Sequence, residues 1–407
     1  MTPVLKALTG TTFSCLLCLF AFNTAINLAY PQGLPKYQDN ADLWGTQVAK
    51  LPAMLQSKEN ADVLILGASG ILFPSVRCDD NFYQRQTRYD DWYMKYNIWK
   101  YSKSDFFASL LSKRLGKEVT LANSAVGGCM ASDQYLILTK FLASGKRPKL
   151  VLLFSGPKDF LDNHRQKVEK TSTYVQLADL PVRITDILQG NTRYDTAIPE
   201  LTEAVMQSIS SYYFYRDNYR AMLAHETSVL TNHPEDLKTA MAKLGQEEKA
   251  PLTKQQKEEA AQKKDAKFAP TRDRKDLVLF KKTYLPVNQS QFDTQAKYFE
   301  KIVGLAKSNN IPIEITFMPL TPEHIAVLPP EVWNNYKNKV KAIAANADVH
   351  CWDPASEIAF QATDFEDSAH LDAAGGQKFF KYMTEHVCDD PRICESLTDN
   401  KVQIGQR

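Results

Sequence analysis

Three residues of this sequence have the types and spacing that nucleophilic catalysis needs. Ser69 comes two residues after Gly67 in the segment LILGASGI, and Asp367 precedes His370 by three residues in DSAH. A serine hydroxyl is a poor nucleophile until a neighbouring base takes its proton, and a histidine of near-neutral pKa suits that task. We therefore predict Ser69 as nucleophile, His370 as base and Asp367 as the group that orients the imidazole. Two alternatives stay open, because Ser69 could simply cap a helix and Asp372 could replace Asp367.

A second set of residues could stabilise the negative charge that forms on an attacked carbonyl. The motif NSAVGG, residues 123–128, ends in Gly128, whose backbone can approach a ligand closely. Ser69 is expected at a helix amino terminus, where backbone N–H groups and the helix dipole favour negative charge. We predict the N–H groups of Ser69 and Gly128 as oxyanion donors. Asn123 of this motif and Asp159 of a third motif, GPKD, are predicted to bind substrate.

The elements that would position these motifs alternate along the chain, with short apolar runs separated by helical patterns. Strands are expected at residues 63–66, 119–122, 150–154, 313–317 and 349–352, and helices at 104–115, 291–308 and 331–345. This spacing predicts a flavodoxin-like α/β fold, a three-layer sandwich around a five-stranded parallel sheet. Each motif follows a strand, so all of them should meet at the carboxyl edge of the sheet, where open α/β folds carry their sites.

One long segment does not fit this alternation. Residues 165–290 are too long for one crossover, and 16 of the 31 residues at 246–276 are charged. We interpret residues 165–290 as a helical and charged, partly disordered insertion in a domain at 36–390. Within it, the aromatic stretch at 211–219 is interpreted as a cap helix. Residues 391–407 are expected to form a tail.

The amino terminus predicts export from the cytoplasm. No charged residue occurs at positions 7–35, and residues 8–28 are just long enough to span a bilayer as a helix. Lys6 favours a cytoplasmic amino end, so residues 1–35 are expected to be a membrane anchor, with a cleaved signal peptide as the alternative. Either way the main domain would be extracytoplasmic, periplasmic or at the cell surface. In that oxidising space Cys388 and Cys394 could pair, or all the thiols could stay unpaired.

Composition excludes other classes of protein. The 49 Lys and Arg residues against 47 Asp and Glu residues leave a net charge of +2, which gives no reason to expect nucleic acid as a partner. The only C-x-x-C pair, Cys15 and Cys18, lies in the apolar run and lacks a second pair at zinc spacing. We therefore expect neither a metal nor a cofactor.

Taken together, the motifs resemble those of the SGNH (GDSL-like) hydrolase superfamily over residues 60–160 and 310–385. The resemblance implies that Ser69 is the nucleophile, Gly128 the oxyanion glycine, and Asp367 with His370 the D-x-x-H block. Ala68 stands in place of the usual Asp of the first block. Lys158 stands in place of the oxyanion Asn of the third block, so it could donate to the oxyanion, anchor an anionic substrate group or mark a loss of hydrolysis.

Within this superfamily the chain resembles a membrane-anchored envelope branch, which is itself similar to the proteins of polysaccharide O-acetylation and D-alanyl transfer. The resemblance implies a serine esterase or O-acyltransferase acting on an envelope or extracellular glycan through an acyl-serine intermediate. A carbohydrate or another acylated small molecule would be the substrate, and a membrane-bound acyl-donor protein a possible partner. The alternative is a non-catalytic SGNH-like domain that binds glycan or acts as a scaffold for an acylation machinery.

Overall fold

The computed structural model describes residues 50–84, 101–165, 167–189 and 275–398, with isolated positions before residue 50 and at 202 and 205. The chain divides into two compact units. The first comprises residues 1–42 and 179–269, and its described part is mainly helix α9 (Leu180–Leu188), which the Asp179 side chain caps by accepting the Val182 N–H. The second comprises residues 43–178 and 270–407 and holds all the motifs.

A five-stranded parallel sheet forms the centre of the second unit. Its strands follow the order β2-β1-β3-β4-β5, which is the order of flavodoxin-like doubly wound sheets. The strands are β1 (Val63–Leu66), β2 (Leu121–Asn123), β3 (Leu150–Ser155), β4 (Ile313–Phe317) and β5 (Cys351–Trp352). The three central strands β1, β3 and β4 are buried at every position, as covered parallel strands are. The predicted sheet is confirmed.

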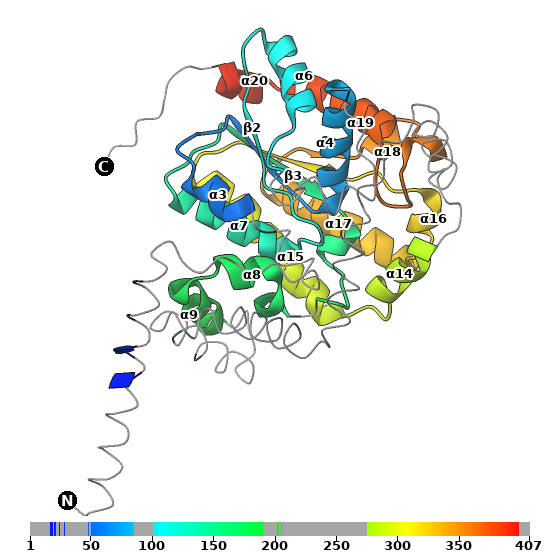
Figure 1. Cartoon of the computed structure of the whole chain (residues 1–407). Helices are drawn as coiled ribbons and strands as arrows, with labels where there is room; N and C mark the ends of the chain where they lie inside the picture. Colours follow the sequence, from blue (N-terminus) through cyan, green and yellow to red (C-terminus); the bar gives the residue numbers. More distant parts are fainter. Residues whose placement is uncertain are drawn as a thin grey trace, which may run out of the picture. The chain divides into compact units, whose positions relative to one another are not determined.

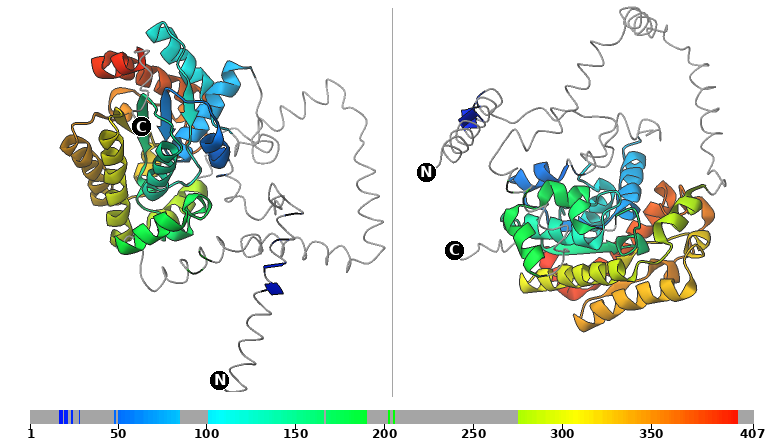
Figure 2. Two further views of the ribbon diagram at one scale, coloured as in Figure 1. Left: turned by 90° about the vertical axis from the view of Figure 1, so that its left-hand side faces the viewer. Right: turned by 90° about the horizontal axis from the view of Figure 1, so that it is seen from below.

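Helices cover both faces of this sheet (Figure 1), and the turned views keep the same grouping (Figure 2). On one face lie α4 (Ser69–Phe82), α6 (Asp105–Leu115), α19 (Ala373–Asp389) and α20 (Pro391–Thr398). On the other lie α3 (Lys50–Gln56), α7 (Ala131–Ala143), α15 (Gln289–Ser308) and α17 (Pro330–Asn346). The remaining described elements of this unit are α8 (Ser172–Leu177), α14 (Lys275–Tyr284), α16 (Pro322–Ile325), α18 (Pro354–Glu357), η2 (Pro157–Asp159), η3 (Val168–Lys170) and η4 (Ala362–Asp364).

The carboxy-terminal segment corrects one prediction. Residues 391–398 are not a tail, because they form helix α20. Ile393 and Leu397 lie four residues apart on one face of this helix and are almost fully buried in the core formed with α4, α6 and α19. One such apolar pair is too little to distinguish a short packed helix from a tail in the sequence alone.

The predicted membrane anchor and two predicted parts of the insertion remain without a structural test. No helix among the described residues is long and apolar enough to cross a membrane, and most of residues 8–28 lie outside those residues. The charged tract at 246–276 and the aromatic stretch at 211–219 also lie outside them, apart from the first residues of α14.

Cys388 and Cys394 are described, and both are free thiols, so the pairing considered from the sequence is not formed.

Candidate active site

The turn after strand β1 places Ser69 at the first position of helix α4. Gly67 makes this turn possible, because a Cβ atom there would lie 2.7 Å from the Ile71 Cγ2 atom and 3.3 Å from the Phe154 backbone oxygen. The N–H groups of Ile71 and Leu72 donate to the Ala68 carbonyl, whereas those of Ser69 and Gly70, the first two of the helix, have no acceptor among the described residues. The strand-to-helix turn therefore presents both the hydroxyl and the N–H of Ser69 at the carboxyl edge of the sheet.

Asp367 and His370 reach Ser69 from a tight loop before helix α19. The base of this loop is closed by an antiparallel bridge between Phe365 and Leu371 and by a bond from the Glu366 N–H to the His370 carbonyl. His370 Nε2 lies 2.9 Å from Ser69 Oγ, and His370 Nδ1 lies 2.7 Å from Asp367 Oδ2. Residues 301 positions apart thus form one continuous chain of hydrogen bonds, as the sequence predicts.

The structure also decides between the two candidate carboxylates. Asp367 Oδ1 accepts the N–H groups of Ala369 and His370, which leaves Oδ2 for the imidazole. Asp372 instead caps helix α19 by accepting the Gly375 N–H. Asp367 is therefore the residue that orients His370.

Electrostatics in this group follow from burial and from one ion pair. Burial alone would lower the pKa of His370, but the Asp367 carboxylate outweighs it by charge and hydrogen bonding, so the pKa of His370 is raised. Burial alone would raise the pKa of Asp367, but attraction to His370 and three hydrogen bonds lower it to about 2. Asp367 thus remains charged over the whole range in which His370 titrates.

Helix α4 also fixes the imidazole ring. Phe73, one turn after Ser69, stacks on His370 with ring centroids 4.2 Å apart and an interplanar angle of 18°. Arg77, one turn further, forms an ion pair with Glu366 of the loop that carries Asp367 and His370. One face of one helix therefore holds the nucleophile, the ring that packs on the base and an anchor for the loop.

The loop after strand β2 brings Gly128 to the same edge. Gly128 adopts a φ of +68°, in the left-handed region that favours glycine, and its N–H has no acceptor among the described residues. The loop is tied to β1 by bonds from the Ser124 hydroxyl to the Ile65 carbonyl and from the Val126 N–H to the Gly67 carbonyl. These bonds link the loop that carries Gly128 to the turn that carries Ser69, which brings together the segments of the two predicted oxyanion donors.

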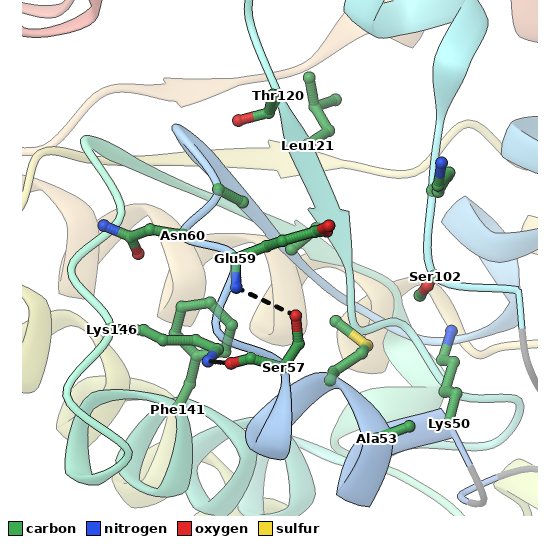
Figure 3. A pocket seen from close by; sticks show the side chains of 14 residues that line it. Lys50, Ala53, Ser57, Glu59, Asn60, Ser102, Thr120, Leu121, Phe141 and Lys146 are labelled. Atoms are coloured by element: carbon green, nitrogen blue, oxygen red, sulfur yellow. Dashed lines mark hydrogen bonds between the residues drawn. The ribbon is translucent and has the colours of Figure 1, made fainter.

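A buried lysine supports this loop from behind. Lys50 of helix α3 is 2 % exposed, and its Nζ donates to the carbonyls of Ala125 and Tyr101. Burial lowers the pKa of Lys50 to about 7. Lys50 also lines a cavity of about 580 Å³ between α3, β2 and α7 (Figure 3). This cavity adjoins the amino ends of β1 and β2 and is distinct from the site at the carboxyl edge.

Arg165 is a residue of this site that the sequence interpretation missed. Its guanidinium donates to the Gly128 carbonyl and occupies the space over that glycine, where a Cβ atom would lie 2.6 Å from the guanidinium carbon. Gln291 of helix α15 holds the Arg165 carbonyl at 2.9 Å. In the sequence Arg165 lies seven residues after Lys158, and this spacing does not predict its contact with Gly128.

Lys158 follows strand β3 in η2 and adds positive charge beside the triad. Its Nζ lies 3.8 Å from the Asp162 carboxylate and 5.9 Å from the centroid of the Phe280 ring. Burial lowers the pKa of Lys158, which attraction to Asp162 opposes. The ammonium charge in turn acts to lower the pKa of both His370 and His324, so Lys158 contributes to the electrostatics of the triad.

Asn123 and Asp159 lie inside the protein and shape loops. Asn123 is fully buried, and its Oδ1 accepts the Ala125 N–H in the turn that leads to Gly128. Asp159 is 1 % exposed and accepts the Gly156 N–H, and burial raises its pKa to about 7. In this structure neither side chain is open to a substrate, in contrast to the binding role predicted for both.

His324 supports the loop of Asp367 and His370 through the side chain of Ser368. It is fully buried, with Nδ1 3.0 Å from the Ser368 hydroxyl and Nε2 2.9 Å from the Tyr284 hydroxyl. Burial, with a smaller effect of His370, lowers the pKa of His324 to about 4, so it stays neutral. The Ser368 N–H donates to Asp276 of helix α14, which fixes the middle of the DSAH motif.

Two comparisons with known proteins bear on this chain. The model of a family described as "Protein of unknown function (DUF1574)" matches residues 100–386. No curated protein matches the sequence. The family match includes Gly128, Lys158, Asp367 and His370, and it begins after Ser69.

Proposed function

Because the chain belongs to the DUF1574 family, whose function is unknown, we propose from its own site that it is a serine-dependent esterase or O-acyltransferase. The observation that supports this proposal is the unbroken chain of hydrogen bonds from Ser69 through His370 to Asp367. Nucleophile, base and orienting carboxylate at hydrogen-bond distance are the general signature of covalent catalysis by a hydroxyl.

The proposed reaction begins with attack of Ser69 Oγ on an ester carbonyl, while His370 Nε2 takes the hydroxyl proton. The N–H groups of Ser69 and Gly128 stabilise the oxyanion. The tetrahedral intermediate collapses, His370 returns the proton to the leaving alcohol, and the acyl group stays on Ser69. Water then releases a carboxylic acid, or the hydroxyl of an acceptor takes the acyl group, again with His370 moving the proton.

The proposed substrate and location depend on the resemblance to the SGNH superfamily and on the apolar amino terminus. We place the site on the extracytoplasmic side of a membrane, acting on an acylated envelope or extracellular glycan, with a membrane-bound protein as possible acyl donor. A reporter enzyme that works only outside the cytoplasm, fused after Arg407, should then be active. A reporter active only in the cytoplasm would refute this location.

Turnover of a small acetyl ester by the purified chain tests the proposed chemistry. We expect hydrolysis that Ser69→Ala and His370→Ala both abolish, and product that shifts from free acetate to acetylated sugar when an oligosaccharide acceptor is added. Hydrolysis that persists in the folded Ser69→Ala variant would contradict the proposal. Lys58→Ala, at an exposed position, is the control, and it shows how much activity is lost through purification of a variant alone.

The second candidate is a non-catalytic scaffold or glycan-binding domain, and one observation favours it. The Arg165 guanidinium occupies the space over Gly128. In addition, Lys158 stands where the resemblance to the SGNH superfamily implies a neutral asparagine. If the guanidinium blocks the oxyanion position, Arg165→Ala should create or raise ester turnover. If Arg165 instead assists an anionic substrate, the same change should lower turnover.

A further inference from the structure

A second cluster of chemically active side chains lies at the amino ends of strands β4 and β5, whereas the triad lies at the carboxyl ends of the strands. Glu314 is the second residue of strand β4, and His350 immediately precedes strand β5. Asp390 lies between helices α19 and α20. One ligand atom from each of the three residues lies within 4.8 Å of the other two.

Two carboxylates converge on one nitrogen of this cluster. His350 Nδ1 lies 3.4 Å from Glu314 Oε1 and 3.2 Å from Asp390 Oδ2. This nitrogen is buried, yet among the described residues it makes no hydrogen bond of acceptable geometry. A ring nitrogen carries at most one proton, so a proton can serve only one of the two oxygens.

The distances fit a small cation placed between the three atoms. A tetrahedral zinc ion with bonds of about 2.0–2.1 Å holds its ligand atoms about 3.3 Å apart, close to both measured separations. Glu314 is 3 % exposed, and its Oε1 accepts no hydrogen bond from the described residues. A charged carboxylate oxygen buried in this way is stabilised by a positive partner.

The surroundings of the cluster resemble the support that metal ligands receive. The Trp352 indole N–H donates to Glu314 Oε2, and the Arg392 N–H donates to Asp390 Oδ1, so each carboxylate is held by its other oxygen. A cavity of about 350 Å³ adjoins the cluster, giving a path for an ion and room for water as a further ligand. It is lined by His350, Trp352, His386, Asp389, Asp390, Pro391 and Arg392.

We propose that Glu314, His350 and Asp390 bind one divalent ion of the zinc class. An imidazole nitrogen with two carboxylates suits zinc and its neighbours in the first transition series, whereas magnesium and calcium prefer sites made of oxygen alone. The ion would link strands β4 and β5, through Glu314 and His350, to Asp390 at the end of helix α19. The proposal does not depend on the activity of the triad.

The main competitor for Asp390 is the guanidinium of Arg392, which lies 3.2 Å from Oδ2. Arg392 is 61 % exposed in its side chain, so it can turn toward solvent when an ion takes Oδ2. Its backbone N–H would keep Oδ1. The variant Arg392→Ala should therefore bind zinc at least as tightly as the parent chain.

Calorimetric titration of the purified, EDTA-treated full chain with zinc chloride tests the proposal. We expect one zinc ion per chain, binding in the micromolar range or tighter, with a rise in the melting temperature. Cobalt(II) bound in its place should give the visible absorption of tetrahedral cobalt. Neither magnesium nor calcium should produce these effects.

Variants assign the binding to this cluster. His350→Ala and the isosteric Glu314→Gln should each weaken zinc binding by about 100-fold or more, on the scale at which even supporting residues cost 10- to 100-fold. His164→Ala, an exposed histidine elsewhere, and His370→Ala, in the triad, should bind zinc as the parent does. Absence of stoichiometric binding, or binding that folded Glu314→Gln retains in full, would overturn the proposal.

Discussion

The Asp367 carboxylate performs two tasks at the scale of single residues. One oxygen organises the backbone of its own loop, and the other holds and charges the imidazole of His370. The three-residue spacing in DSAH was enough to predict the pair. It could not exclude Asp372, because only the backbone geometry shows that this side chain is used as a helix cap.

Replacement of Asp367 by Asn should lower both the activity and the pH at which activity appears. His370 must be neutral to accept a proton, so activity is lost as the pH falls through its raised pKa. Without the carboxylate this pKa falls and the acidic limb of the pH profile moves to lower pH. We expect kcat to fall by about 10³–10⁴-fold, as for loss of an orienting carboxylate in other triads. An acidic limb that stays in place would show that Asp367 does not act on His370.

Replacement of Lys158 by Met should shift the same limb in the opposite direction. The ammonium disfavours a protonated His370, so its removal raises the pKa of His370 and moves the acidic limb to higher pH. The exposed Lys282→Met is the control and should leave the profile unchanged. A shift to lower pH, or none, would remove Lys158 from the electrostatics of the site.

Helix α4 shows how one element organises the site. Its sequence places Ser69, Phe73 and Arg77 at intervals of four, so their common face could be predicted from the chain alone. The position of Arg165 could not, because its loop is held by Gln291, which lies 126 residues further along the chain. No local pattern records a contact of that kind.

The stacking of Phe73 on His370 makes a prediction for this helix. Phe73→Ala should loosen the imidazole and lower kcat by about 10- to 100-fold, since small displacements of a catalytic group are costly. Phe82→Ala, in the same helix but 47 % exposed, should leave kcat nearly unchanged. Ester turnover with both variants at equal folded concentration is the measurement. Equal turnover in the two variants would refute a positioning role for Phe73.

For the whole molecule, the apolar runs predicted five strands and their parallel sheet, because buried parallel strands have a distinctive composition. Strand limits were less accurate for physical reasons. The N–H of Thr120 bonds the Asp62 side chain, and the N–H of Val349 closes the end of helix α17, so β2 and β5 begin two residues later than predicted. The role of residues 391–398 was missed since a helix of eight residues carries little signal by itself.

Helix α20 should contribute to the stability of the whole second unit. Leu397 is fully buried against the core, so Leu397→Ala should lower the free energy of unfolding by about 3 kcal/mol. The adjacent exposed Glu395→Ala should change it by less than about 0.5 kcal/mol. Chemical denaturation of the two variants and the parent provides the comparison. Equal stability would mean that α20 is not part of the cooperative unit.

The central claim is that Ser69 is a nucleophile activated by His370, and reaction with a fluorophosphonate probe tests it most directly. Intact-mass and peptide analysis should find one adduct per chain, on Ser69, absent from Ser69→Ala and strongly slowed in His370→Ala. This result needs no knowledge of the acyl group or of its acceptor. A folded chain that forms no adduct, or that reacts equally well without His370, would contradict the account.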